Sequence, residues 1–338
     1  MDPSLFDARV TEGDEFFILE ESAFVDAWSP GLGRALKQTG ATLLRLRDWQ
    51  HGNVSVLVPH SEHLTQVHVE CEIADLSALA EFPRLEALYV PCALDTIDFS
   101  RTRSLKTVGY SGDAPDFGNL HAAHSLKELK LTGTELRDLE PLSGLAHLET
   151  LILREAPLKS LKGIEGLRSL KRLVLGRLPL ESLEELRHAS DLTEISLAFL
   201  RIPSLAELTR LSRLTILSVW SCRKVRDLEC IGELVKLEDL ELGSIGPLPP
   251  PEFLGSLKSL KSLRLESVGK IPSLQFLRDL RQLEEFLPVD KTIVEDGDLS
   301  VLLELPSLKK VVFTERRHYS HRRDDIRAVL SARSGTGK

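Results

Sequence analysis

The strongest constraint on the fold is a leucine motif that recurs twelve times along the chain. Copies of L-x-x-L-x-L, some with another apolar residue in place of a leucine, run from Leu64 (LTQVHV) to Leu308 (LKKVVF). Successive copies start 20 to 25 residues apart. A steady period of this length is typical of a solenoid, in which each unit packs only on its neighbours. The sequence therefore predicts one extended array of stacked coils.

Each unit combines two rhythms. The last four residues of the motif alternate apolar with variable residues, which is the two-residue period of a strand with one buried face. Farther along, leucines recur every third residue, as at Leu136, Leu139, Leu142 and Leu145. A period of three suits 3₁₀ or turned backbone better than an α-helix, and Pro141 in this stretch agrees. We therefore expect a strand followed by a 3₁₀ or turn segment in every unit.

These units resemble the 22-residue leucine-rich repeats of internalins and of protein phosphatase 1 regulators, over roughly residues 61–315. The resemblance implies an α/β solenoid: a leucine-rich repeat arc with a parallel β-sheet on its concave face and 3₁₀ or turn segments on its convex face. It also implies that a partner binds on the concave face. The family often keeps asparagine at the ninth position of a unit, whereas this chain mostly has apolar residues there. The loop amides are therefore expected to find other partners.

The two ends of the chain depart from the repeat. Residues 1–60 are predicted to form an amino-terminal cap, in which Ser29, Pro30 and Gly40 mark the start and end of a short helix. Residues 43–58 fit either a hairpin or a degenerate first repeat, and Leu43, 21 residues before Leu64, favours the repeat. Residues 316–338 are predicted to form a carboxyl-terminal cap helix from near Asp324 and a disordered tail.

Charge is distributed unevenly. The net charge is −8, but from Lys309 onward there are 9 Lys/Arg against 3 Asp/Glu, which leaves 34 against 48 in residues 1–308. An acidic body repels nucleic acid and anionic membranes and suits a basic protein partner. The basic stretch ERRHYSHRR could contact nucleic acid or an acidic protein, or could be a cap with solvated arginines. The acidic body favours the cap.

Nothing in the sequence indicates catalysis. No convergent set of polar residues interrupts the repeat, so we expect no enzyme activity, cofactor or metal. Cys71 and Cys92 occupy the eighth position of adjacent units, close enough for a disulfide, although two buried thiols fit a reducing compartment better. The chain shows no secretory leader pattern and no apolar run of about 18 residues. We therefore expect a cytoplasmic protein with no membrane partner.

The third, fifth and seventh residues of each unit are expected to face solvent on the concave face. Trp220, in LTILSVWSC, is the most conspicuous of them, and it continues an apolar strip with Ile152, Val174 and Ile216. Arginines are expected on the amino-terminal side of the strip and acidic residues toward the carboxyl end. The candidate partner-binding residues are Tyr89, Ile152, Arg154, Arg172, Val174, Arg177, Glu194, Ile216, Trp220, Asp239, Glu241 and Glu266. Such a patch is typical of an interaction site, although Trp220 could instead fold down over Ser196 or Gly243.

The sequence thus predicts a non-enzymatic intracellular module that binds a protein partner with a basic surface. A narrower hypothesis is an inhibitor or immunity-type protein that neutralises a basic effector or toxin. Two alternatives remain open: a regulatory subunit of a phosphatase or small GTPase, and a receptor for a glycan or other small ligand. Nucleic acid is not an expected partner, and the sequence does not indicate an oligomeric state.

Overall fold

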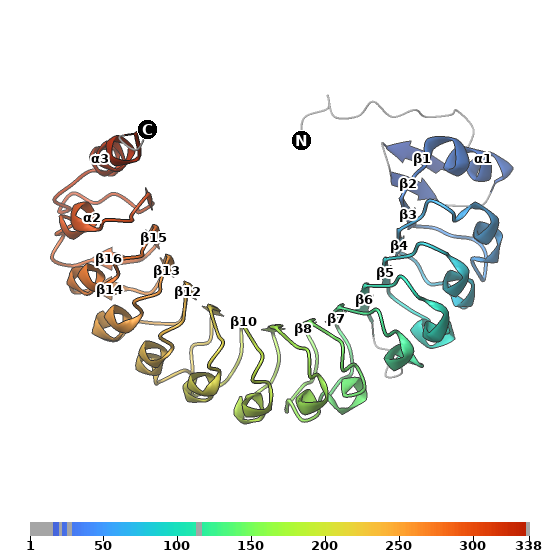
Figure 1. Ribbon diagram of the computed structural model, residues 1–338, viewed down its shortest axis with the longest axis horizontal. Helices are drawn as coiled ribbons and strands as arrows, with labels where there is room; N and C mark the ends of the chain where they lie inside the picture. The colour runs from blue at the N-terminus through green and yellow to red at the C-terminus, as the bar shows by residue number, and fades with distance from the viewer. Residues whose placement is uncertain (1–15, 20–21, 26–28, 113–116, 336–338) are drawn as a thin grey trace. The chain divides into compact units, whose positions relative to one another are not determined.

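The structure is a computed structural model that describes residues 16–19, 22–25, 29–112 and 117–335 (Figure 1). It divides into two compact units, each described here by itself. The first unit contains Met1–Pro157 with Gly166–Ser169, and the second contains Leu158–Glu165 with Leu170–Lys338. The 3₁₀ turn Ile164–Gly166 falls where the units divide.

The first unit is built on a sheet in which each strand pairs with the next along the chain. Strand β1 pairs with β2 in antiparallel fashion, and all later pairs are parallel. The strands are β1 (Phe16–Leu19), β2 (Ser22–Val25), β3 (Leu43–Leu46), β4 (Gln66–Val69), β5 (Ala87–Val90), β6 (Thr107–Ser111), β7 (Glu128–Thr132) and β8 (Thr150–Arg154). The 3₁₀ segments are Ser55–His60, Ser77–Glu81, Leu94–Thr96, Phe99–Arg101, Leu120–Ala122 and Glu140–Leu142.

The second unit has the same plan, with a wholly parallel sheet. Its strands are β9 (Arg172–Gly176), β10 (Glu194–Ala198), β11 (Ile216–Trp220), β12 (Asp239–Gly243), β13 (Ser262–Glu266), β15 (Glu285–Val289) and β17 (Lys310–Val311). Strands β14 (Lys270–Ile271) and β16 (Ile293–Val294) form a separate two-stranded sheet. The 3₁₀ segments are Glu184–His188, Ala206–Arg210, Leu228–Glu233, Pro251–Ser256 and Gln275–Asp279, and the helices are α2 (Val301–Glu304) and α3 (Arg323–Gly335).

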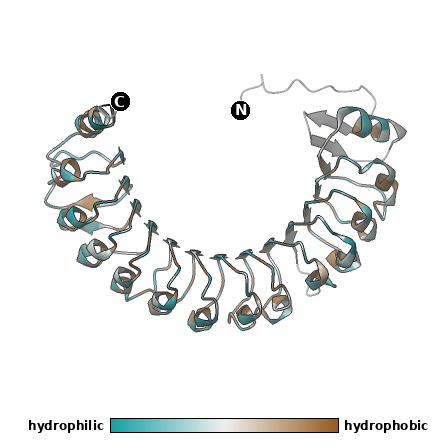
Figure 2. Ribbon diagram, in the orientation of Figure 1, coloured by the Kyte–Doolittle hydropathy of each residue, from teal (hydrophilic) through white to brown (hydrophobic). Residues whose placement is uncertain are grey.

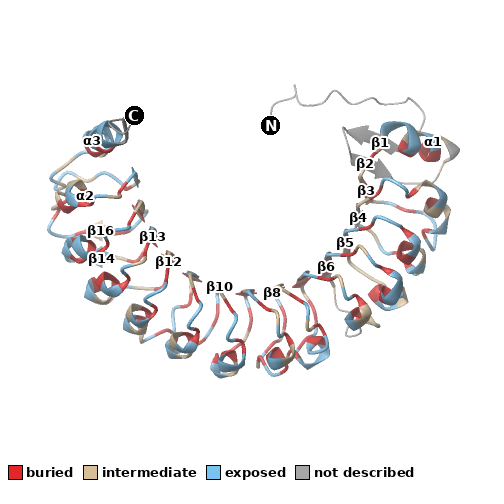
Figure 3. Ribbon diagram, viewed as in Figure 1, coloured by how far each residue is buried: buried red, intermediate tan, exposed pale blue. Residues whose placement is uncertain are grey.

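The leucine rhythm builds the core between the strands and the 3₁₀ segments. In the coil of β11, Leu217 and Val219 point inward from the strand and are fully buried. Leu205 and Leu208, from the stretch with period three, are fully buried as well. The same alternation of hydrophobic and buried residues can be followed coil by coil in Figures 2 and 3. Each such side chain contributes roughly 1.5–3 kcal/mol of burial free energy, and the expected strand and 3₁₀ pattern is confirmed.

The helix expected between Ser29 and Gly40 is α1 (Pro30–Thr39). The Ser29 hydroxyl accepts a hydrogen bond from the Leu32 amide at 3.2 Å, and Gly40 ends the helix with a φ of 65°. Leu32 and Leu36 bury the inner side of the helix. The two ends therefore form as general capping chemistry predicts.

The hairpin alternative for residues 43–58 is wrong. Strand β3 pairs with β4 in parallel, with Leu44 opposite Val67, and Ser55–His60 forms a 3₁₀ segment in place of a second strand. Strands β1 and β2 extend the sheet further toward the amino terminus, and the repeat pattern did not predict them.

In the coils of β7 to β13 and of β15, the chain turns out of the strand through a residue with positive φ at the eighth position of the unit. Arg177, Phe199 and Ser221 have φ values of 55°, 56° and 51°. Their amides donate to the seventh-position carbonyl of the next coil, as in the 2.8 Å bond from Phe199 N to Trp220 O. These bonds satisfy loop amides without an asparagine ladder, and they offset a conformation that costs roughly 1–2 kcal/mol for a residue other than glycine.

Helix α3 lies at the carboxyl-terminal end of the second unit. Ile326 and Leu330 are buried, and the helix contacts α2 and β17. The tail expected to be disordered includes residues 336–338, which lie outside the described residues. In the part of the chain that is described, no helix is long and apolar enough to cross a membrane.

Candidate functional site

The candidate site is the exposed sheet face, which we define as the third, fifth and seventh residues of the coils. The parallel register aligns these residues in rows across the strands. In the second unit one row contains Glu194, Ile216 and Asp239, the next contains Ser196, Ser218 and Glu241, and the third contains Ala198, Trp220 and Gly243. Neighbours in a row lie about 4.8 Å apart, so each row presents its side chains to one ligand.

Trp220 lies flat over its neighbour in the row. A Cβ atom built on Gly243 would come within 2.6 Å of both Cδ2 and Cζ3 of the indole, so the ring rests directly on the Gly243 backbone. The guanidinium of Arg264 lies 6.0 Å from the ring centroid, within the range of a cation–π contact. The packing that we considered for Trp220 over Gly243 is therefore present. The side chain nevertheless keeps intermediate exposure.

The apolar strip is less continuous than the sequence suggests. Ile216 is 39% exposed, but Val174 is only 7% exposed, so the expectation that Val174 faces solvent is wrong. Neighbours on the adjoining strands, about 5 Å away, cover a short side chain even on the outer face of a sheet. Of the predicted strip, Ile216 and Trp220 of β11 thus keep accessible apolar surface in the second unit.

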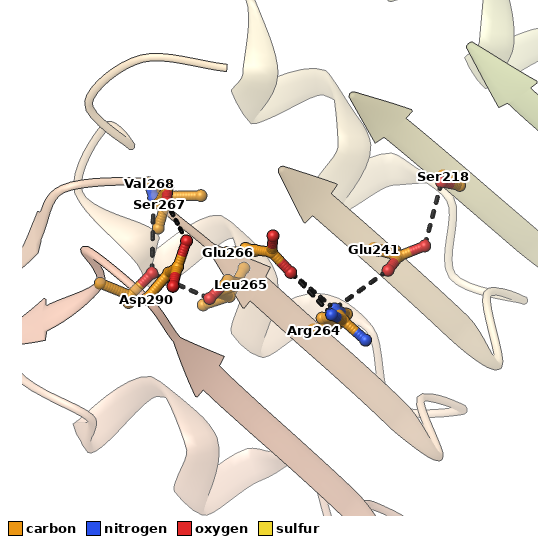
Figure 4. Close-up of polar contacts among 9 residues, drawn as sticks. Ser218, Glu241, Arg264, Leu265, Glu266, Ser267, Val268 and Asp290 are labelled. Atoms are coloured by element: carbon orange, nitrogen blue, oxygen red, sulfur yellow. Dashed lines mark hydrogen bonds and ion pairs between the residues drawn. The ribbon is translucent and has the colours of Figure 1, made fainter. Parts of the chain in front are cut away.

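The charged residues of this face form ion pairs. The sequence analysis expected the arginines and the acidic residues to lie in two separate regions. Arg172 Nε lies 2.6 Å from Glu194 Oε1 on the neighbouring strand. Arg264 bridges Glu241, at 3.1 Å, and Glu266, at 2.7 Å, as Figure 4 shows. The hydrogen bond to Glu266 raises the pKa of Arg264. These carboxylates are already neutralised within the protein.

Asp239 is the exception on this face. Burial raises the pKa of its carboxyl group, and the carboxylates of Glu241, Glu285 and Glu194 raise it further. A hydrogen bond with Ser262 opposes the shift. No ion pair of Asp239 is found among the described residues. An uncompensated carboxylate therefore lies beside the exposed Ile216.

Arg177 lies at the turn that follows β9 and not on the exposed sheet face. Its guanidinium is 5.2 Å from the ring centroid of Phe199, which is 53% exposed at the equivalent turn of the next coil. The sequence analysis missed Phe199. A large apolar residue at the eighth position, where the following coils have Ser221, Ser244 and Ser267, was the available signal.

The first unit holds the remaining candidates. Tyr89 lies over Gly109, where an added Cβ would meet its Cε1 at 2.8 Å. Lys130 Nζ is 3.4 Å from the Tyr89 hydroxyl oxygen. Ile152 follows Lys130 in the same row, and Arg154 is exposed at the end of β8. The structure thus separates the predicted residues into two groups, one on each unit.

The cysteines are free thiols. Cys92 Sγ is 3.4 Å from the Ile73 carbonyl oxygen, and Cys71 Sγ is 3.7 Å from that of Leu46. No disulfide joins this pair, and both thiols are half-buried where the sequence analysis expected buried ones. Groups of three or more His, Cys, Asp or Glu able to hold a metal ion do not occur within the described ranges.

Comparison with known proteins identifies the fold. No protein-family model and no curated protein matches the chain. Among solved structures, an internalin from Listeria monocytogenes superimposes with a TM-score of 0.55 at 19% identity, covering 89% of this chain and 86% of that one. The chain has the leucine-rich repeat fold. A leucine-rich repeat protein from Leptospira interrogans is also similar, with a TM-score of 0.48 at 16% identity over 85% of this chain and 93% of that one.

Proposed function

We propose that this leucine-rich repeat protein is a non-enzymatic binding module that recognises a protein partner with a basic surface. The exposed sheet face of the second unit is the proposed contact. Ile216 and Trp220 supply accessible apolar surface on the first and third of the three rows, and aromatic residues of this kind dominate many interfaces. The rigid strand beneath them limits the entropy lost on binding.

The carboxylate of Asp239 carries the proposal: it is partly buried beside Ile216 and forms no ion pair among the described residues. Burial and the neighbouring carboxylates, Glu241 first among them, raise the pKa of Asp239, so the folded protein disfavours its ionised form. A lysine or arginine of a partner would supply that cation through a charge-assisted hydrogen bond. Its aliphatic stem would at the same time cover Ile216, as long basic side chains commonly cover apolar surface. Binding would thus relieve a local electrostatic penalty.

The narrower role that we propose is an inhibitor or immunity-type protein of the cytoplasm that neutralises a basic effector or toxin. The net charge of −8 supports it, since opposite charge accelerates the encounter of two proteins. The four free thiols suit a reducing compartment.

The test is affinity capture from extract of the source cells with the immobilised full chain, followed by binding measurements with the purified partner. Trp220→Ala and Asp239→Asn are compared with Val235→Ala, which changes a residue that is 56% exposed outside the exposed sheet face. We expect each test variant to weaken binding at least about tenfold and the control to match wild type. Circular dichroism verifies folding.

Two results would refute the proposal. The first is a partner that binds wild type, Trp220→Ala and Asp239→Asn equally well. The second is turnover in a hydrolase or transferase screen that is abolished by a substitution on the exposed sheet face.

A further inference from the structure

A second candidate site lies far along the chain from Trp220, just before α3. Residues 315–322 enclose a cavity of about 300 Å³. Its lining consists of Glu315, Arg316, Arg317, Tyr319, His321 and Arg322. This is the basic stretch for which the sequence favoured a cap with solvated arginines over a contact with nucleic acid or an acidic protein.

Closing the end of the repeat does not require these cations. Phe313, Ile326 and Leu330 are buried and complete the apolar core there. The ring of Tyr319 packs edge-on against Phe313, with 5.8 Å between centroids. Apolar and aromatic side chains thus perform the capping, and the arginines add little to it: Arg316 Nη2 donates one long hydrogen bond to the Asp290 carbonyl oxygen, at 3.5 Å.

The acidic residues of the segment are occupied elsewhere. Glu315 Oε1 accepts a hydrogen bond from the Arg323 amide at 3.0 Å, and Asp325 Oδ2 accepts one from the Arg322 amide at 3.4 Å. Arg316, Arg317 and Arg322 form no ion pair with any carboxylate in the described part of the chain. The Nε atom of Arg316 is enclosed and has no hydrogen-bond partner among those residues.

The other polar groups of the cavity have protons to donate. The Tyr319 hydroxyl oxygen accepts from the Val294 amide at 3.1 Å, which leaves its own proton for another acceptor. Ser320 Oγ accepts from the Leu299 amide at 2.9 Å and lies 2.8 Å from His321 Nδ1. In either tautomer the His321 imidazole carries at least one N–H group that can donate a hydrogen bond. The lining offers hydrogen-bond donors of both kinds, charged and neutral.

We propose that this cavity binds a phosphoryl group carried as a phosphate monoester. Guanidinium groups match the oxygens of phosphate in bidentate geometry. A phosphate monoester near neutral pH carries a charge between about −1.5 and −2, which balances three arginines better than a single carboxylate does. The cavity volume lies at the lower end of small-ligand sites, about 300 Å³, so it has room for the group that carries the phosphate. A long polyanion is disfavoured by the acidic body of the protein.

Isothermal titration calorimetry on the full chain tests this proposal. The probes are inorganic phosphate, a phosphoserine peptide, its unphosphorylated form, acetate and a single-stranded DNA 20-mer. The variants are Arg317→Ala, Arg322→Ala, their double variant and Arg317→Lys. The control is Arg281→Ala, an exposed arginine in another loop.

We expect one phosphoserine peptide to bind per chain, with affinity lowered at least about tenfold by each alanine variant. The affinity of Arg317→Lys for the peptide should lie between those of wild type and Arg317→Ala. Lysine keeps the positive charge but cannot bind two phosphate oxygens in the bidentate geometry of a guanidinium group. Equal affinity for inorganic phosphate and the peptide would support the site and identify a free phosphate compound as its ligand. Tighter binding of the peptide would indicate a phosphorylated partner.

Three outcomes would overturn the proposal. Binding by the double variant that matches wild type would show that the arginines are not the site. Acetate or the unphosphorylated peptide binding as well as the phosphopeptide would remove the preference for phosphate. DNA that binds more tightly than the phosphopeptide would make the segment a nucleic-acid contact. None of these results depends on the Trp220 surface, so the two proposals fail separately.

Discussion

Substitution of Gly243 by alanine tests the position of the Trp220 ring directly. A methyl group on Gly243 would stand 2.6 Å from two indole carbons, so the ring must lift from the strand. Lifting it exposes roughly 50 Å², about a quarter of the area that a buried tryptophan covers. At about 25 cal/mol per Å² this loses about 1.2 kcal/mol. Replacing a glycine within a strand by alanine raises the free energy of unfolding by about 0.5–1 kcal/mol, which partly offsets this loss.

These two contributions predict that Gly243→Ala changes stability in opposite directions in wild type and in the Trp220→Ala variant. In wild type, Gly243→Ala should lower the free energy of unfolding by about 0.5 kcal/mol. In Trp220→Ala, where no ring obstructs the methyl group, the same change should raise it by about 0.5–1 kcal/mol. The coupling between the two positions is then roughly 1–1.5 kcal/mol, as expected for residues in contact.

Urea denaturation of the four proteins, followed by circular dichroism, measures this cycle. Tryptophan fluorescence gives an independent readout, with Trp220→Phe used to subtract the signal of Trp28 and Trp49. The emission of Trp220 should shift to longer wavelength in Gly243→Ala. If Gly243→Ala changes stability by the same amount in both backgrounds, the indole does not rest on Gly243 and our account of this surface is wrong.

Three further predictions concern single positions. Asp239→Asn should stabilise the protein by about 0.5 kcal/mol at pH 7. The pKa of Asp239 is higher in the folded protein than in the unfolded chain, where it is about 3.9, so the folded protein loses stability as the pH rises from the unfolded pKa through the folded pKa. The advantage should therefore vanish in urea titrations at pH 3.5, and its persistence there would refute the electrostatic cause. Burial and nearby carboxylates raise the pKa of Cys230 to about 12, so alkylation by iodoacetamide at pH 8, followed by mass spectrometry, should be at least about 100-fold slower than in the unfolded chain. Ser221→Val places a β-branched residue at a φ of 51° and should lower the free energy of unfolding by about 1–2 kcal/mol, whereas Ser221→Gly should not destabilise the protein. Equal melting temperatures for the two variants would show that the backbone at this position is not strained.

Much of the fold follows from the sequence because its period fixes the environment of each residue. A leucine at a core position, such as Leu217, is buried on the strand, and the three-residue rhythm around Leu208 predicts the 3₁₀ segment. Strands β1 and β2 were not predicted, because each is only four residues long and lies outside the repeat period. The sequence between them, Glu20 and Glu21, also lacks the Asn-Gly or Asp-Gly pair that signals a tight hairpin.

The candidate site was only partly predictable, because position in a unit gives the row of a side chain but not its partners. Arg172 and Glu194 were placed on the correct face, yet their 2.6 Å contact depends on side-chain rotamers on adjoining strands. The exposure of Val174 depends on the neighbours that surround it. Asp239 can be distinguished from the other carboxylates only in the structure, which shows the ion pairs that those carboxylates form.

The repeat also explains why unfavourable charge can persist on this protein. The core leucines of each coil fix the backbone independently of the outward-facing residues, so an outward residue can be unfavourable without disturbing the fold. Asp239, which is partly buried and forms no ion pair among the described residues, is such a case. Positions where local energetics and the fold disagree are commonly functional. Neutralising Asp239 should therefore stabilise the isolated protein and weaken binding at the same time, a combination that a purely structural residue would not give.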